Sequence, residues 1–173
     1  MNQYSELLYY IKTLGDADTF VNTITHGEFD KIDLDKANIF PLLHASVTGA
    51  SFTNGSTVVF NVQIGCLNQR ETNKNINTDK FWDNDNEVDN MNETLAVLNR
   101  IWVTMYRNFQ DKNIIASENP SLEPMFEDRT NLLDGWILTF DVEIPNTTLN
   151  LCDAVVENNL FDATFDATFD LTF

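Results

Sequence analysis

An Asn-Gly pair, Asn54 and Gly55, divides a long stretch of strand-forming sequence into two arms. The arms run from Pro41 to Thr53 and from Ser56 to Leu67, and apolar side chains alternate with others along the second arm. Such a pair between strand-like runs is the strongest short-range signal for a β-hairpin, because both residues tolerate the positive φ angles of a tight turn. The chain is therefore expected to contain antiparallel sheet. Arms of this length let the hairpin project from the body or wrap around it.

Two segments place apolar residues at helical spacing. The first follows Asn2, which suits an N-cap, and closes at Gly15. The second runs from Val88 to Phe109, over about six turns. The periodic residues are Tyr4, Leu7, Leu8, Ile11 and Leu14 in the first segment and Val88, Met91, Leu95, Leu98, Trp102, Met105 and Phe109 in the second. Each pattern predicts an amphipathic helix with one apolar stripe on a core.

Two further segments are typical of strands. The residues from Phe20 to Thr25 are rich in Thr, Val and Ile and predict a short strand before a turn at His26-Gly27. From Trp136 to Ile144, large apolar residues alternate with Ile137, Thr139, Asp141 and Glu143, and Pro145 stops the strand. Strict alternation of this kind predicts a strand with one buried face.

Two segments show no regular pattern. Asn68 to Asn90 is polar, rich in Asn and free of glycine, and is predicted to be a long loop. Lys112 to Thr130 contains Pro120 and Pro124 and is predicted to be irregular, since proline interrupts both helices and strands.

The chain closes on a repeated unit, FDATFDATFDLTF, from Phe161 to Phe173. A helix would stack its aspartates at unfavourable i, i+4 spacing and would contain β-branched threonines, whereas an extended strand places all the phenylalanines on one face. Ordering such a segment costs more than burying its phenylalanines returns, unless a sheet edge receives its backbone. Three alternatives remain: a last strand of the protein's own sheet, a strand added to a neighbouring subunit or partner, or disorder until assembly.

These elements follow one another as helix, short strand, long hairpin, long helix, strand and tail strand. Two helices against one mostly antiparallel sheet predict an α+β fold, a two-layer sandwich with a long β-hairpin and an extended C-terminal strand. We expect residues 1–151 to form the domain and residues 152–173 to form an arm that carries the FDAT repeats.

The composition limits the classes of partner. The chain of 173 residues carries 27 acidic and 10 basic residues, a net charge of −17, and is 43% hydrophobic. Such a charge argues against specific nucleic-acid binding, which needs a basic face for the phosphates. It is compatible with plain solubility, with a surface that must not adhere to DNA, or with basic partners.

The residues offer little chemistry. His26 and His44 are the two imidazoles, and His44 is expected to be a hydrogen-bonded sheet residue because it lies in a hairpin arm. The run from Asp83 to Glu87 begins like a calcium loop but lacks the required glycine and the final acid, so it fits a helix N-terminus better. No nucleophile elbow or phosphate-binding glycine loop is present. We expect no enzymatic activity, no cofactor and no metal.

Two further expectations concern thiols and targeting. Cys66 and Cys152 are isolated and are expected to be buried thiols. The N-terminal residues show no signal peptide, and no apolar run is long enough for a membrane span, so no membrane partner is expected.

The order of elements resembles the small tail-terminator and head–tail joining proteins of tailed bacteriophages. The segments that carry the resemblance are NQYSELLYYIKTL, HASVTGASFTNGSTVVFNVQIGCL, NETLAVLNRIWVTMYRNF and DGWILTFDVEIP, within Met1 to Leu151. The Asn-rich, glycine-poor composition is also similar to structural proteins of phages of AT-rich hosts, including crAss-like phages with stacked neck rings. The FDAT repeat departs from the family pattern.

The resemblance implies a virion protein, made in the host cytoplasm, that forms a ring of six or twelve copies in the phage neck. Such a ring would contact adjacent neck, portal or tail proteins and line the passage of double-stranded DNA without binding it specifically. The alternative is a monomeric acidic binding module or assembly adaptor that captures basic or extended peptides. The residues expected at subunit interfaces are Phe161, Phe165, Phe169 and Phe173 in the arm and Phe52, Asn54, Gly55 and Val58 in the hairpin.

Overall fold

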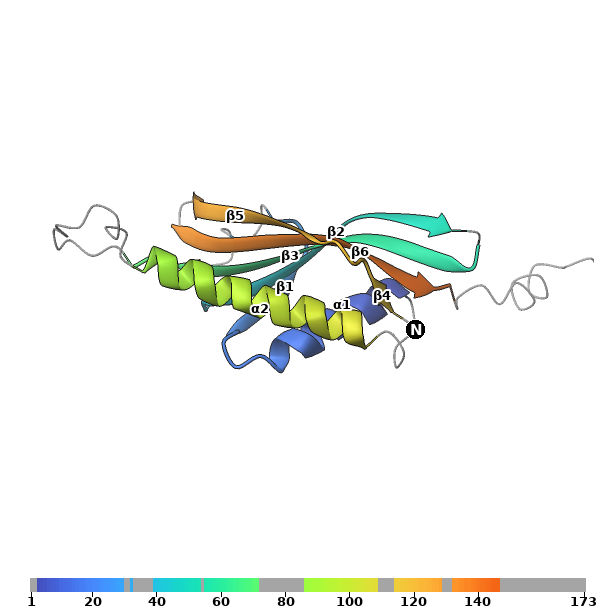
Figure 1. Ribbon diagram of the computed structural model, residues 1–173, viewed down its shortest axis with the longest axis horizontal. Helices are drawn as coiled ribbons and strands as arrows, with labels where there is room; N and C mark the ends of the chain where they lie inside the picture. Colours follow the sequence, from blue (N-terminus) through green and yellow to red (C-terminus); the bar gives the residue numbers. More distant parts are fainter. Residues whose placement is uncertain are drawn as a thin grey trace, which may run out of the picture.

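The computed structural model describes residues 3–29, 32, 39–53, 55–71, 86–108, 114–128 and 132–146, which form two helices on one face of a six-stranded sheet (Figure 1). The elements in chain order are α1 (Gln3–Asp16), β1 (Thr23–His26), β2 (Leu42–Thr53), β3 (Thr57–Gln69), α2 (Glu87–Arg107), β4 (Ile115–Ala116), β5 (Ser121–Asp128) and β6 (Leu133–Pro145). The predicted α+β class and its sheet-and-two-helix sandwich are confirmed. The predicted arm, residues 152–173, lies outside the described residues.

Strand β3 is central to the sheet. The strands lie in the order β1-β2-β3-β6-β4, and β5 also pairs with β6. The predicted hairpin of β2 and β3 is confirmed, and it is antiparallel with one irregularity between Val47 and Gly49. Only β1 pairs in parallel, with the start of β2; every other described pair is antiparallel.

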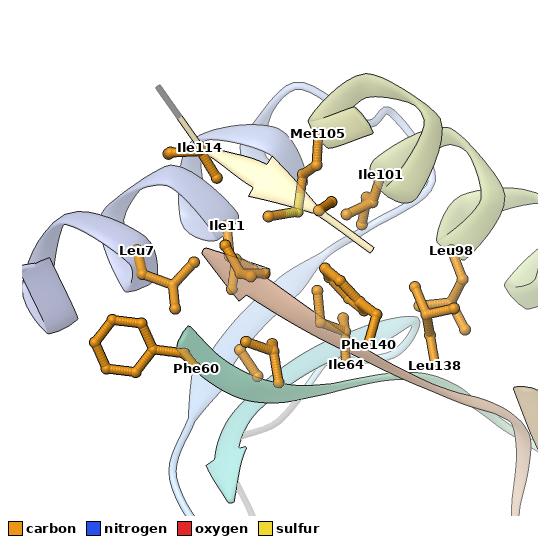
Figure 2. Packing of buried hydrophobic residues seen from close by; sticks show 14 of the residues in the cluster. Leu7, Ile11, Phe60, Ile64, Leu98, Ile101, Met105, Ile114, Leu138 and Phe140 are labelled. Atoms are coloured by element: carbon orange, nitrogen blue, oxygen red, sulfur yellow. The ribbon is translucent and has the colours of Figure 1, made fainter. Parts of the chain in front are cut away.

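The main core lies between the helices and the sheet. The alternating apolar residues of the second hairpin arm, Val58, Phe60, Val62, Ile64 and Cys66, are all buried in it. Figure 2 shows helix residues and sheet residues meeting in this layer, including Leu7 and Ile11 of α1, Leu98, Ile101 and Met105 of α2, and Leu138 and Phe140 of β6. The apolar residues that alternate along the strands thus pack in one layer against those that recur every three or four positions along the helices.

A second, smaller cluster lies on the opposite side of the sheet. Leu42, Leu67 and Leu133 alternate with residues of the main core, so they point to the other face, where Ile32 and Met125 join them. Phe29, Phe40 and Ile137 pack against this cluster. Part of the chain between β1 and β2 therefore covers the back of the sheet at the start of β2.

The segment Lys112 to Thr130 was predicted to be irregular, and that prediction is wrong. It contains β4 and β5, which pair antiparallel with β6. Pro124 is compatible with β5 because β5 is an edge strand, and edge strands are where a sheet accommodates proline. Proline therefore marks an edge here and does not end the sheet.

The buried stripe of α2 differs from the predicted one. Val88 is 41% exposed, whereas Asn90 and Thr94 are buried together with Val97, Leu98, Ile101 and Met105. Asn90 and Thr94 can be buried because both are hydrogen-bonded: Thr94 Oγ1 donates to the Asn90 carbonyl at 2.6 Å, and Asn68 Nδ2 donates to Asn90 Oδ1 at 2.9 Å. The stripe is rotated toward these polar residues.

Three boundaries also differ slightly. Helix α1 continues past Gly15 to Asp16. A Cβ at Gly15 would lie 2.8 Å from side-chain atoms of both Ile24 and Leu43, so this glycine allows the helix to approach the sheet closely. Strand β1 begins at Thr23, and Phe20 packs partly buried against the core. Strand β3 extends through Asn68 and Gln69, which the predicted loop had included.

Gly135 is the position where the backbones of β3 and β6 leave no space for a side chain. A Cβ there would lie 2.0 Å from the Cys66 carbonyl oxygen and 3.1 Å from Leu67 Cα. Both are backbone atoms of the central strand and cannot move aside without breaking the ladder. We expect Gly135→Ala to lower the free energy of unfolding by about 3 kcal/mol, measured by urea denaturation.

Gly49→Ala is the matched control, because a Cβ at Gly49 meets no atom within 4 Å. It should change the free energy of unfolding by less than about 0.5 kcal/mol. Equal effects of the two substitutions would contradict the close approach at Gly135.

Candidate functional site

The outer half of β2 is an open edge of the sheet. Strand β1 pairs only with Leu42–Ala45, and no described strand pairs with the free side of β2 from Ser46 to Thr53. Along this stretch Thr48–Thr53 are all exposed. Backbone N–H and C=O groups on such an edge can receive another strand.

The predicted hairpin interface residues have different environments. Phe52 is 76% exposed, the highest value among the exposed large hydrophobic residues of the described chain, whereas its register partner Val58 is 5% exposed and belongs to the core. Gly55 lies in the turn with φ +71°, and its carbonyl accepts a hydrogen bond from Asn146 Nδ2. The side chain of Phe52 is therefore accessible to a partner, whereas the side chain of Val58 packs in the main core.

The other predicted interface residues are Asn54 and the four phenylalanines of the arm, Phe161, Phe165, Phe169 and Phe173. All five lie outside the described residues, so the structure does not place them.

The open edge of β2 carries no charge. The chain has 27 acidic and 10 basic residues, yet none lies between Lys36 and Arg70. The edge from Ser46 to Thr53 also lacks proline. Lysine, other charges and proline are the usual means of blocking an exposed strand. The β2 edge has none of them.

Strand β5, at the opposite side of the sheet, is a blocked edge. It contains Pro124 and Glu123, both exposed, and its pairing with β6 is irregular between Met125 and Asp128. These features prevent strand addition in the ways that natural edge strands use. Among the described strands, these two edges are therefore unlike: β5 carries features that block pairing, and the outer half of β2 carries none.

A groove lies between α2 and β5. It has a volume of about 450 Å³, and Leu95 and Trp102 of α2 line it together with Pro120 and Leu122. Leu122 is 40% exposed. None of the described residues that line the groove is charged. Sequence reasoning missed this groove because it treated the β5 segment as irregular.

A buried ion pair joins the end of β3 to the start of β6. Arg70 Nε and Nη2 each donate to a carboxylate oxygen of Asp134 at 2.8 Å, and Arg70 also pairs with Glu87 at the start of α2. Asp134 is fully buried and Arg70 is 8% exposed. Bidentate geometry of this kind fixes three elements relative to one another. It is a structural junction, and sequence reasoning missed it because its members are far apart in the chain.

A second ion pair joins the end of α1 to α2. Arg100 Nε donates to Asp18 Oδ2 at 2.7 Å, and the Phe20 N–H donates to Asp18 Oδ1 at 3.0 Å. The hydrogen bond from Arg100 lowers the pKa of Asp18, although burial opposes the shift. A lowered carboxyl pKa stabilises the fold above the unfolded-state pKa, and the effect is lost as the pH falls through the folded-state pKa.

His44 and Cys66 are both buried in this fold. His44 Nδ1 lies 2.8 Å from Thr25 Oγ1 and its Nε2 lies 3.2 Å from the Gly27 carbonyl oxygen, which confirms the prediction of a hydrogen-bonded sheet residue. Cys66 is a buried free thiol, as predicted, and burial raises its pKa. Among the described residues no group of three or more His, Cys, Asp or Glu is placed to hold a metal ion. No described helix is long and apolar enough to span a membrane.

A scan against known protein-family models finds no match for this chain, and a search of curated proteins finds none either.

Asp134→Asn tests the buried junction. It removes the charge of Asp134, the fully buried one of the two carboxylates that pair with Arg70, so we expect the free energy of unfolding to fall by about 3 kcal/mol. Asp141→Asn is the matched control on the same strand, because Asp141 is exposed and accepts a hydrogen bond from Asn61. The control should change stability by less than about 1 kcal/mol. If urea denaturation gave both variants a similar loss in the free energy of unfolding, burial of the Arg70–Asp134 pair would not be the source of its contribution to stability.

Proposed function

We propose that this chain is a structural virion protein that assembles with copies of itself into a ring in the neck of a tailed phage, where it joins the portal to the tail. The observation that carries the proposal is the uncharged, proline-free edge of β2 with Phe52 exposed beside it. A long open edge is a liability for a protein that works alone. The same edge is useful in a protein that functions as an assembly in which another chain pairs with it.

The distribution of charge supports self-association. Copies with a net charge of −17 repel one another, and like charges brought together in an interface are unfavourable. An interface between such copies is expected to use surfaces without carboxylates. The stretch between Lys36 and Arg70 supplies one, and it contains the whole hairpin.

The same charge suits the passage of DNA. Exposed carboxylates in the lumen of a ring repel phosphates, so the duplex slides and does not bind. Asp141 lies exposed on the back of the sheet, where Asn61 contacts it. The order of elements, which resembles the tail-terminator and head–tail joining proteins, is the second support for a neck ring.

The alternative is a monomeric acidic module that captures basic or extended peptides. The β2 edge would serve that function also, because an extended peptide adds to an open edge through main-chain hydrogen bonds. The groove between α2 and β5 does not favour capture of basic peptides, since none of its described lining residues is acidic. The oligomeric state separates the two functions.

Removal of the arm tests whether the phenylalanine repeat contributes to assembly. We expect a chain without Phe161–Phe173 to unfold with the same midpoint as the full chain but to remain a monomer, as measured by sedimentation velocity and native mass spectrometry. In the matched control the three threonines of the repeat, Thr164, Thr168 and Thr172, are replaced by serine, which should leave assembly unchanged. An unaltered oligomer after the deletion would remove the arm from the mechanism.

Ser51→Lys tests the β2 edge itself. Ser51 is exposed near the hairpin tip, and a lysine there reproduces a natural device against strand addition. We expect self-association to weaken at least about tenfold, equivalent to about 1.4 kcal/mol, with no change in thermal unfolding of the monomer.

Ser5→Lys, at an exposed position on α1, is the matched control and adds the same charge away from the edge. The proposal fails if both lysines have the same effect on the sedimentation profile, or if the full chain stays monomeric at every concentration and with a portal ring present.

A further inference from the structure

The groove between α2 and β5 lies on the neutral face of α2. Asn92, Leu95, Asn99 and Trp102 recur at spacings of three and four, so they lie along one side of the helix and line the groove. The charged residues of α2 avoid this lining: they are Glu87, Asp89, Glu93, Arg100 and Arg107. Among the described residues, the side of α2 that faces the groove is therefore neutral, although the chain as a whole carries a net charge of −17.

The aromatic side of the groove is held in place. Trp102 Nε1 donates to the Ser117 carbonyl at 3.2 Å, and the ring of Trp102 stacks on Tyr106 with centroids 5.5 Å apart. The polar atom of the indole is thus satisfied from within the chain. Pro120 and Leu122 complete the opposite side. The result is an uncharged, largely apolar depression in which the indole N–H of Trp102 is already hydrogen-bonded.

The exposed end of the hairpin is the complementary surface on the same molecule. It presents Phe52, 76% exposed, within a stretch that carries no charge. An aromatic anchor that enters an apolar pocket is the usual centre of a protein interface. None of the described residues that line the groove is charged and the hairpin carries no charge, so like-charge repulsion between two copies is weaker there than at surfaces that carry carboxylates.

The hairpin of one copy does not reach its own groove. The strands lie in the order β2-β3-β6, with β5 beyond β6, so three strand spacings of about 4.8 Å each separate the β2 edge from β5. Figure 1 shows the hairpin tip and β5 at opposite ends of the molecule. The occupant that fits is therefore the hairpin of a second copy.

We infer that the groove between α2 and β5 receives Phe52 from the hairpin of the next copy in the assembly. This inference rests on the proposed ring and names the contact that would build it. Because donor and acceptor are different patches, the contact is heterologous, and repeated contacts of this kind close into a ring or extend into a filament. Side chains stand roughly perpendicular to a sheet, whereas the backbone groups of its edge lie in the plane. Phe52 and the β2 edge can thus be engaged independently.

A photo-cross-linker at Phe52 tests the contact directly. The full chain with benzoylphenylalanine at position 52 is mixed with an equal amount of ¹⁵N-labelled wild-type chain, irradiated, digested and analysed by mass spectrometry. We expect mixed-isotope cross-links to the peptides that contain Leu95, Trp102 or Leu122. The matched control places the same group at Tyr9, which is 69% exposed on α1, and should give no such adduct.

A charge in the groove supplies an independent test. We expect Leu122→Asp to weaken self-association at least tenfold, whereas Phe126→Asp should not, because Phe126 is 54% exposed on the same strand but does not line the groove. An oligomer that forms with cross-links from position 52 elsewhere, or that tolerates Leu122→Asp, overturns this contact and leaves the proposed ring standing. A full chain that remains monomeric, with no mixed-isotope cross-links even beside a portal ring, overturns both.

Discussion

The pairing of β3 with β6 holds the rest of the structure in place. Register runs without a break from Thr57 opposite Pro145 to Gln69 opposite Leu133. A specific contact lies at each end of the ladder. At one end the Asn146 N–H donates to the Ser56 carbonyl at 2.8 Å, and at the other Arg70 forms an ion pair with Asp134. One end thereby positions the start of α2 through Glu87, and the other supports the hairpin tip. The groove and the exposed edge are both consequences of this single ladder.

Much of the fold could be predicted because its signals are local. The Asn-Gly turn and the alternation from Val58 to Cys66 define the hairpin, and the periodicity of α2 defines the longer helix. Local periodicity could not show which side of α2 faces the sheet, because tertiary contacts set the rotation of a helix about its own axis. Asn90 and Thr94 are more buried than Val88, and their hydrogen bonds allow it; one of them joins Asn90 to Asn68 of β3, a partner that the periodicity of the helix does not reveal.

The candidate surfaces were predicted less completely, for a related physical reason. Phe52 and Val58 share one face of the hairpin by register, yet one is exposed and the other buried, since cover by α1 and α2 decides exposure. The groove depends on β5, whose Pro124 was read as a break in structure. Proline excludes a central strand but permits an edge, and sequence alone does not distinguish the two when the neighbouring strand is unknown.

The contrast between the two sheet edges links the fold to the proposed assembly. A folding domain gains solubility from charge, and this chain has charge almost everywhere except the hairpin. Lysines or a proline on β2 would protect the monomer from aggregation, as Pro124 and Glu123 protect β5. The β2 edge and Phe52 lack that protection, although substitution there would not disturb the core, because Thr48–Thr53 are exposed. In the proposed assembly, pairing with another copy accounts for the difference, because an uncharged edge does not bring carboxylates of this acidic chain together.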